Sequence, residues 1–303
     1  MQVGDLAHSL SNSQQASQLI ARCNFPSEPT PAAVSGGADS MALMLLAHKH
    51  GCLSEVVHVD HGLRPQSHQD VEVINSVASQ LGINVRAVRI EVGSGTNLEA
   101  RAREARYSVL PSFVMTGHTQ DDQAETVIIN LLRGSGTAGL AAMNSDTNHP
   151  LLDLRRFETE GLCRALGVNY VNDETNADPK YQRNRIRSEV IPLLNEVSRR
   201  DIVPVLARQA EILRADDALL QSLAHQIDPT DARALTQADP ALAKRALRAW
   251  MADPYPPDSA AIDRAMAVAR GEILGTDLGG GRHLSRHQQV LKISRTESTN
   301  HDD

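Results

Sequence analysis

A glycine-rich loop near the N-terminus carries the first residues that could do chemistry. The loop is Ser35-Gly36-Gly37-Ala38-Asp39-Ser40, called here the SGGADS loop, and it lies between an expected strand at 32–34 and an expected helix at 41–51. Glycines let successive backbone N–H groups point inward, and the following helix adds the positive end of its dipole. The alternative is an ordinary glycine turn with Ser or Asp as the helix cap. The strand–loop–helix context favours a phosphate cradle.

A second group of polar side chains follows another expected strand, at 113–118, and opens a helix. In the sequence GHTQDDQAET, at 117–126, His118, Asp122 and Glu125 are spaced i, i+4 and i+7, so they would share one helical face. Acids in a first turn also suit the helix dipole, which would explain one carboxylate. Three aligned polar side chains are better explained as the lining of a site.

The sequence HVDHGLR, at 58–64, closes another expected strand. It places Asp60 and His61 at the edge of the sheet where ligands collect in α/β proteins. The sequence offers no third close ligand for a metal at this point, and we interpret His58 as a polar strand end.

Arginines are concentrated in two segments. Arg101, Arg103 and Arg106 form a stripe on an expected helix at 97–110, where they either face solvent or contact phosphate, and spacing alone does not decide. Segment 181–214 holds seven arginines and four acids, a surplus of three positive charges on a chain whose net charge is −7. A local basic strip on an acidic protein is compatible with one defined polyanion site.

The densest basic run is Arg183-Asn184-Arg185-Ile186-Arg187, called here the RNRIR segment. Such a run is usually a solvated helix face, but within a basic strip contact with an RNA backbone is a serious alternative. Aromatic residues are only 3% of the chain, which disfavours a platform that stacks single-stranded bases.

The elements that must position these residues alternate between strand and helix from residue 31 onward. This order predicts an α/β fold, a parallel sheet with helices on both faces, and ligands at the carboxyl ends of its strands. After about residue 181 the pattern becomes helical and ends in a short β-like stretch, so we expect a smaller, mainly helical domain to follow. The domains are placed at 1–215 and 216–303.

Composition limits the classes to which the protein can belong. Its 303 residues suggest about two domains. No run approaches the ~18 apolar residues of a membrane helix, and the N-terminus lacks the pattern of a secretory signal. The three cysteines, Cys23, Cys52 and Cys163, form neither a disulfide framework nor a CxxC metal site. We therefore expect a cytoplasmic globular protein. The oligomeric state stays open, with a homodimer as one option.

In this order, the motifs resemble the N-type ATP pyrophosphatase (PP-loop) superfamily and, within it, the family of tRNA(Ile)-lysidine synthetases. The resemblance is strong over residues 31–194 and weaker through the helical region that follows. SGGADSMALM at 35–44 is typical of the whole superfamily, whereas LLRGSGTAGL at 131–140 and the RNRIR segment are typical of this branch. The chain departs from the pattern at His149, where the family usually has arginine before Pro-Leu-Leu. It also has one helical domain, as in the family's shorter members.

The resemblance implies ATP-dependent ligation of free L-lysine to C2 of the wobble cytidine of tRNA(Ile) with a CAU anticodon. ATP would first adenylate the cytidine and release pyrophosphate, and the lysine amine would then displace AMP to form lysidine. The implied cofactors are ATP and Mg²⁺. The lysine amine has a pKa of about 10.4 and must lose a proton before it attacks, so a nearby carboxylate is the expected acceptor of that proton.

Residue roles follow from the same resemblance. The expected ATP-binding residues are Ser35, Gly36, Gly37, Ala38, Asp39 and Ser40, with Asp39 acting through Mg²⁺. The expected catalytic residues are Asp39, Asp122, Glu125, Arg103 and Arg106. The expected tRNA-binding residues are Arg183, Asn184, Arg185 and Arg187. Asp60, His61 and His118 are expected to line the site.

Two other functions are compatible with parts of the pattern. A tRNA thiolase of the same superfamily would generally carry paired cysteines, which this chain lacks. A non-catalytic nucleotide-binding regulator would need the SGGADS loop, but neither the GHTQDDQAET group nor a basic strip. Consumption of ATP that depends on added tRNA would separate an enzyme from a regulator.

Overall fold

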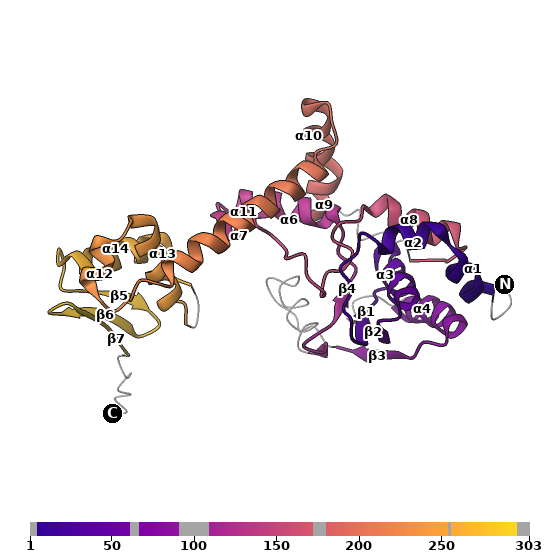
Figure 1. Cartoon of the computed structure of the whole chain (residues 1–303), viewed down its shortest axis with the longest axis horizontal. Coiled ribbons are helices and arrows are strands. Elements are labelled where there is room, and N and C mark those ends of the chain that lie inside the picture. The colour runs from indigo at the N-terminus through magenta and orange to yellow at the C-terminus, as the bar shows by residue number, and fades with distance from the viewer. Residues whose placement is uncertain (1–4, 61–66, 91–108, 172–179, 254–255, 296–303) are drawn as a thin grey trace. The chain divides into compact units, whose positions relative to one another are not determined.

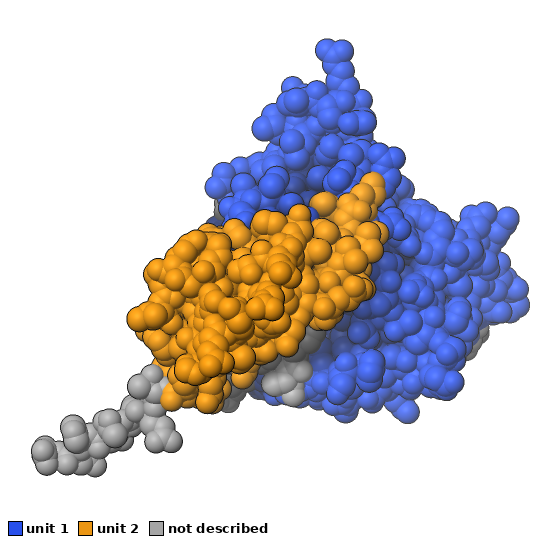
Figure 2. All heavy atoms as spheres, turned by 60° about the vertical axis from the view of Figure 1, so that its left-hand side comes forward, with its two compact units in different colours: residues 1–211 blue, residues 212–303 orange. Residues whose placement is uncertain are grey.

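The computed structural model describes residues 5–60, 67–90, 109–171, 180–253 and 256–295. These residues form two compact units, residues 1–211 and residues 212–303, which Figure 2 shows in different colours. The division falls within the long helix α11 (Val203–Ala224). Within the described residues, no helix combines the length and the apolar composition that crossing a membrane would require.

A four-stranded parallel sheet organises the first unit (Figure 1). Its strands are β1 (Thr30–Ala33), β2 (Leu53–Asp60), β3 (Val85–Arg89) and β4 (Met115–Thr116), in the spatial order β3-β2-β1-β4. All three neighbouring pairs are parallel. Because β1 and β4 are neighbours, the SGGADS loop after β1 and the GHTQDDQAET sequence after β4 leave the same edge of the sheet. The predicted parallel sheet flanked by helices is confirmed.

Helix α3 (Ala38–His50) is buried from Ser40 to Ala47, where all residues but Ser40 are apolar. It packs with α1 (Asp5–Asn12), α2 (Gln14–Ile20), α4 (Ser67–Leu81) and α8 (Arg156–Ala165) in the main hydrophobic cluster. Val56 of β2 belongs to this cluster, whereas Val57 belongs to a smaller one with Leu110 and Val114. Neighbouring residues of a strand point to opposite faces, so both faces of the sheet are buried. The helix expected at 97–110 lies almost wholly outside the described residues.

The GHTQDDQAET sequence, the glycine-rich loop after it and the RNRIR segment lie on or beside five further helical elements of the first unit. They are α6 (Gln120–Leu132), α7 (Thr137–Leu140), α9 (Gln182–Arg185), the π-helical turn η2 (Ile186–Val190) and α10 (Ile191–Ser198). Ala124 and Ile128 of α6 pack against Ile186, Ile191 and Val203. This small apolar cluster fixes the RNRIR segment against α6.

The second unit has its own core, built from helices and a small sheet. The elements are α12 (Ala232–Gln237), α13 (Pro240–Trp250), α14 (Ser259–Arg270), β5 (Gly275–Gly279), β6 (Arg282–His287) and β7 (Val290–Arg295). The strands are antiparallel in the order β5-β6-β7. Asp231, Asp239 and Asp258 each accept a backbone N–H bond at a helix start, as aspartate caps commonly do. The β-like stretch that the sequence indicates is this three-stranded sheet.

Gly117 allows the two edge segments of the first unit to approach closely. A Cβ atom at this position would lie 2.9 Å from the carbonyl carbon and oxygen of Asp39 and from the nitrogen of Ser40. All three atoms belong to the backbone, so no side-chain rotation could relieve the clash. Glycine at 117 is therefore required by the contact between the end of β4 and the start of α3.

Gly117→Ala should consequently lower the free energy of unfolding, by about 1–3 kcal/mol, because backbone must move to admit the methyl group. Urea denaturation followed by circular dichroism measures the effect. Gly161→Ala is a matched control within α8, where the new Cβ would meet Gln15 Nε2 at an ordinary 3.6 Å. That control should be neutral or stabilising by about 0.5–1 kcal/mol, as expected for alanine in a helix. Equal stability of Gly117→Ala and the wild type would contradict the close approach.

Candidate active site

The SGGADS loop is held in shape by its own hydrogen bonds. Gly36 adopts φ +92°, a left-handed conformation that favours glycine. The Ser40 hydroxyl is buried; it accepts a bond from the Ser35 backbone N–H at 3.1 Å and donates to the Gly37 carbonyl at 2.8 Å. Gly37 is the N-cap of α3 and provides no side-chain cap. The first-turn N–H groups of α3 therefore suit an anion, while Ser40 shapes the loop from inside.

Asp39 lies in the first turn of α3 and is held by two residues of α8. Its Oδ2 accepts a bond from Arg156 Nε at 3.2 Å, and its Oδ1 accepts a bond from the Thr159 hydroxyl. Burial raises the pKa of Asp39 to about 6, against the positive charge of Arg156, and repulsion from Asp122 adds to the rise. Asp39 is thus a carboxylate whose ionisation the protein opposes, although an arginine stands beside it.

Asp122 both caps helix α6 and carries a charge into the site. Its Oδ2 accepts a bond from the Thr119 backbone N–H at 2.8 Å, which is the Asp122 half of a capping box, and another from the Thr119 hydroxyl at 3.0 Å. Its Oδ1 accepts bonds from Arg156 Nη2 at 2.9 Å and Arg183 Nη2 at 3.2 Å. Burial acts to raise the pKa of Asp122, but the charges of Arg156 and Arg183 outweigh it and hold that pKa below its ordinary value. Asp122 therefore both stabilises the start of α6 and lines the site.

Glu125 lies one turn further along α6 and is completely buried, with 0% of its surface exposed. Its Oε1 accepts a bond from Arg187 Nε at 2.7 Å and its Oε2 accepts one from Arg183 Nε at 2.6 Å. Arg156 Nη1 also reaches Oε1, at 3.3 Å. A buried carboxylate is tolerated when charged donors satisfy both oxygens, as they do here.

Three acids and three arginines therefore form one connected set, called here the site cluster. Its members are Asp39, Asp122, Glu125, Arg156, Arg183 and Arg187. The formal charges of the cluster sum to zero. Acids that the sequence places in two separate motifs are thus brought together in space.

The RNRIR segment is divided between this cluster and the surface. Arg183 and Arg187 point inward to Asp122 and Glu125, whereas Arg185 is 59% exposed and pairs with Glu189 one turn away. The Asn184 carbonyl accepts a bond from the Ser188 hydroxyl at 2.9 Å. Contact of these residues with tRNA stays a prediction.

Arg156 and Thr159 are the members of this region that sequence reasoning missed. The dipeptide Arg155-Arg156 begins α8, where positive side chains oppose the helix dipole. Two arginines at a helix start are unfavourable unless acids lie close to them, so this dipeptide is a sequence signal for ion pairs with acids elsewhere in the chain. Arg155 has its own partners, Asp121 and Asp201.

The histidines lie near the site in a different arrangement from the one expected. His118 precedes Thr119, the N-cap of α6, so helical spacing applies to Asp122 and Glu125 but not to His118. His118 Nδ1 lies 2.8 Å from the Thr116 hydroxyl, and its ring centroid is 5.2 Å from that of His149. His149 Nδ1 lies 3.1 Å from Asp146 Oδ1.

Of the other residues that the sequence singles out, the structure describes Asp60 and His58. Asp60 ends β2, at the carboxyl edge of the sheet. His58 is buried, and its Nδ1 lies 2.8 Å from the Val34 carbonyl oxygen, in agreement with a structural role. His61, Arg103 and Arg106 lie outside the described residues.

The cysteines of the first unit belong to its core. Cys52 and Cys163 are buried in the main hydrophobic cluster, and Cys23 packs against it. Burial raises the pKa of the Cys163 thiol to about 12 and that of Cys52 to about 11, so both stay in the weakly ligating thiol form. In the ranges that the structure describes, no group of three or more His, Cys, Asp or Glu side chains is arranged to hold a metal ion.

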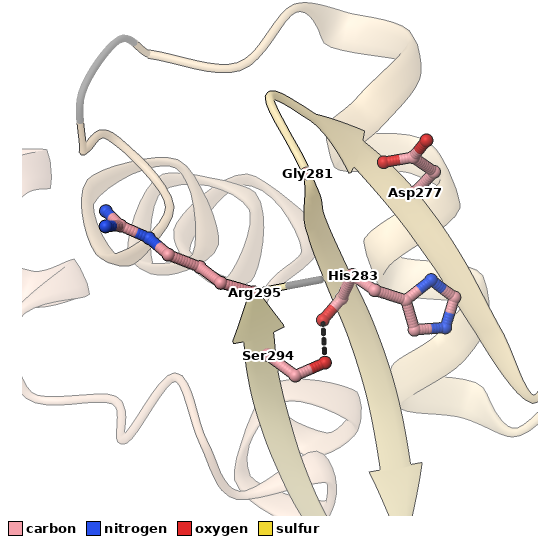
Figure 3. A pocket seen from close by; sticks show the side chains of 5 residues that line it. All are labelled: Asp277, Gly281, His283, Ser294 and Arg295. Carbon is pink, nitrogen blue, oxygen red and sulfur yellow. Dashed lines mark hydrogen bonds between the residues drawn. The ribbon is translucent and has the colours of Figure 1, made fainter. Parts of the chain in front are cut away.

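A separate cavity of about 480 Å³ lies on the small sheet of the second unit (Figure 3). Asp277, Gly281, His283, Ser294 and Arg295 line it, and the Ser294 hydroxyl donates to the His283 carbonyl at 3.4 Å. All of these lining residues belong to the second unit, and none is a member of the site cluster.

Comparison with known proteins identifies the family of the chain. A family model described as a PP-loop domain matches residues 9–194. A tRNA(Ile)-lysidine synthase of Nocardia farcinica is 40% identical over 270 residues, which cover 82% of this chain and 85% of that protein. Its counterpart from Mycobacterium tuberculosis is 34% identical over 291 residues, covering 87% and 90%.

A solved structure is also similar in fold. The U34-tRNA thiolase of Methanococcus maripaludis matches with a TM-score of 0.51 and 17% identity, over 66% of this chain and 79% of that one. At this identity the likeness concerns the fold alone. The match of the PP-loop domain to more than half of the chain, together with the relatives at 34–40% identity, establishes the family. The chain belongs to the PP-loop family and, within it, to the tRNA(Ile)-lysidine synthases.

Proposed function

We propose that this protein uses ATP to join free L-lysine to C2 of the wobble cytidine of tRNA(Ile) with a CAU anticodon. The cytidine is adenylated first, with release of pyrophosphate, and lysine then displaces AMP to give lysidine. The observation that carries the proposal is the meeting of Asp39, from a phosphate-type loop, with Asp122 and Glu125 at one edge of a parallel sheet. The names of the relatives supply the substrate class.

The first step depends on the SGGADS loop and the start of α3. Their N–H groups hold the phosphates of ATP, and Asp39 stands next to them in the first turn of the helix. Mg²⁺ binds proteins through one or two carboxylates together with substrate phosphates, and the Asp39 carboxylate fits that donor set. When bound, the ion would offset the negative charge of the triphosphate. The carbonyl oxygen on C2 of the cytidine is a poor leaving group, so its adenylation prepares C2 for attack by the amine, with AMP as the leaving group.

The second step needs a place for the lysine amine and an acceptor for its proton. The oxygens of Asp122 and Glu125 converge with those of Asp39 around Arg156, which places acids from both motifs at one point. The lowered pKa of Asp122 makes its carboxylate a weak base, better suited to holding an ammonium group than to removing its proton. Which acid accepts the proton is left open by this proposal.

The tRNA would be held by the RNRIR segment, together with Arg103 and Arg106. Arg185 is exposed and can meet a phosphate directly, whereas Arg183 and Arg187 would have to exchange their carboxylate partners. A cytoplasmic location, where tRNA, ATP and free lysine occur together, is part of the proposal.

Incubation with ATP, labelled lysine and total tRNA, followed by nucleoside analysis, tests this function. The label should appear in one modified cytidine, and pyrophosphate should be released only when tRNA is present. ATP binding without tRNA-dependent turnover would indicate a regulator instead. Turnover that depends on a sulfur donor, without incorporation of lysine, would indicate a thiolase.

Asp39→Asn should abolish tRNA-dependent pyrophosphate release without unfolding the protein. Because the pKa of folded Asp39 lies above its ordinary 3.8, the folded state binds this proton more tightly. Proton binding by Asp39 therefore stabilises the folded protein fully below pH 3.8, and this stabilisation is lost as the pH rises through about 6. At pH 8 the Asn variant should therefore be the more stable protein, by at most about 3 kcal/mol, with the gain fading toward pH 4. Pyrophosphate release at the wild-type rate would refute the assigned role.

Arg185→Ala should weaken tRNA binding and reduce the slope of log K against log salt by about 1, the value for one lost phosphate contact. ATP affinity should not change. Glu189→Ala is the matched control, because it removes the partner of Arg185 but keeps the arginine, and it should bind tRNA at least as tightly as the wild type. Filter binding over a series of salt concentrations measures both variants. An unchanged slope for Arg185→Ala would mean that this arginine faces solvent.

A further inference from the structure

Arg156 contacts all three acids of the site cluster with different nitrogen atoms. Its Nε lies 3.2 Å from Asp39 Oδ2, its Nη2 lies 2.9 Å from Asp122 Oδ1, and its Nη1 lies 3.3 Å from Glu125 Oε1. Only 20% of its side chain is exposed. A planar guanidinium is suited to this task, because its donors point in several fixed directions at once.

The acids that Arg156 joins come from different parts of the sequence and repel one another. Asp39 belongs to the loop after β1, whereas Asp122 and Glu125 belong to the helix after β4. Asp122 is close enough to Asp39 for its charge to disfavour ionisation of Asp39. A positive charge between them offsets that repulsion, and each acid keeps a position fixed by its bond to the same group.

The other arginines of the cluster are placed differently. Arg183 and Arg187 bond Asp122 and Glu125 on α6. Arg156, by contrast, is fixed at the start of α8, where its own backbone N–H donates to Asp121 Oδ2 at 2.8 Å. Thr159, on the same turn of α8, holds the other oxygen of Asp39. The first turn of α8 therefore connects the two motifs.

We propose that Arg156 is a positioning residue for both chemical steps, because it sets the spacing between the carboxylate of the SGGADS loop and those of α6. This inference rests on the proposed function and adds a role for a residue that the motifs do not include. If the spacing is lost, ATP held near Asp39 and lysine held near Asp122 and Glu125 are no longer aligned on the same cytidine. Both half-reactions should then slow together.

Two half-reactions should be measured on the full-length protein. The first is tRNA-dependent pyrophosphate release without lysine, and the second is decay of the preformed AMP–tRNA adduct when lysine is added. Arg156→Ala should slow each of them by about 100-fold, the loss expected when reacting groups are displaced by about 1 Å. Arg156→Lys keeps the charge and should keep the fold, but a single ammonium cannot bond three separate acids, so both half-reactions should again slow.

Chemical rescue separates positioning from a loss of structure. Millimolar guanidinium chloride should restore both half-reactions of Arg156→Ala several-fold, because the free ion can occupy the space between the acids, whereas sodium chloride at equal ionic strength should not. Arg155→Ala is the matched control. Arg155 lies at the same helix start with 15% of its side chain exposed, but pairs with Asp121 and Asp201. Guanidinium should not rescue any loss of rate in that variant.

Other results would overturn the inference in identifiable ways. Wild-type rates in Arg156→Lys, a loss confined to one half-reaction, or absence of rescue in folded Arg156→Ala would each contradict a shared positioning role. Should the wild-type protein itself form neither pyrophosphate nor adduct, the proposed function would fail instead. The two failures are therefore distinguishable.

Discussion

The compensation of buried negative charge is the constraint on which the candidate site depends. Glu125 is completely buried and Asp122 nearly so, and a carboxylate in such surroundings is costly unless charged donors surround it. Arg156, Arg183 and Arg187 supply those donors from two separate segments. Arginine serves better than lysine here, because its guanidinium stays charged when buried and can bond several oxygens in fixed directions. Removing any one arginine would leave an acid with incomplete compensation.

Several features of the fold are arranged so that this compensation is possible. The neighbouring positions of β1 and β4 bring two acidic motifs to one edge of the sheet. Gly117 then lets the backbone of the second motif touch that of the first. The start of α8 meets both motifs, and the small apolar cluster around Ile186 places Arg183 and Arg187 against α6. The order of the strands, the close contact at Gly117 and the ion pairs together bring the acids and arginines of the site cluster to one place.

The sequence alone predicts the parallel sheet, the tight loop between β1 and α3, and the placement of Asp122 and Glu125 on one helix, because each has a local signature. Alternation of strands and helices predicts the sheet, and glycines between a strand and a helix predict the loop. The His118 prediction failed in one detail, since the capping box at Thr119 starts the helix after the histidine. A cap depends on two side chains and the backbone together, which spacing does not reveal.

Ion-pair partners could not be predicted in the same way. Arg156 and Asp39 are 117 positions apart, and Arg183 and Glu125 are 58 apart, so no local pattern relates them. The RNRIR segment looks strongly basic in sequence, but in the folded protein Arg183 and Arg187 pair with acids of α6, and Arg185 pairs with Glu189 at the surface. A surplus counted along the chain therefore overstates the positive charge that the surface presents.

The neutrality of the site cluster has a consequence for how ATP reaches the protein. Charges that cancel within a few ångströms produce little potential at a distance, so the cluster itself contributes little to long-range attraction of a polyanion. ATP would be captured by short-range contacts instead, chiefly the N–H groups and dipole at the start of α3. The rate of ATP association would then depend only weakly on ionic strength. Arg185 is likewise paired with Glu189, but both side chains are exposed, so a phosphate of tRNA could replace the carboxylate of Glu189 at close range.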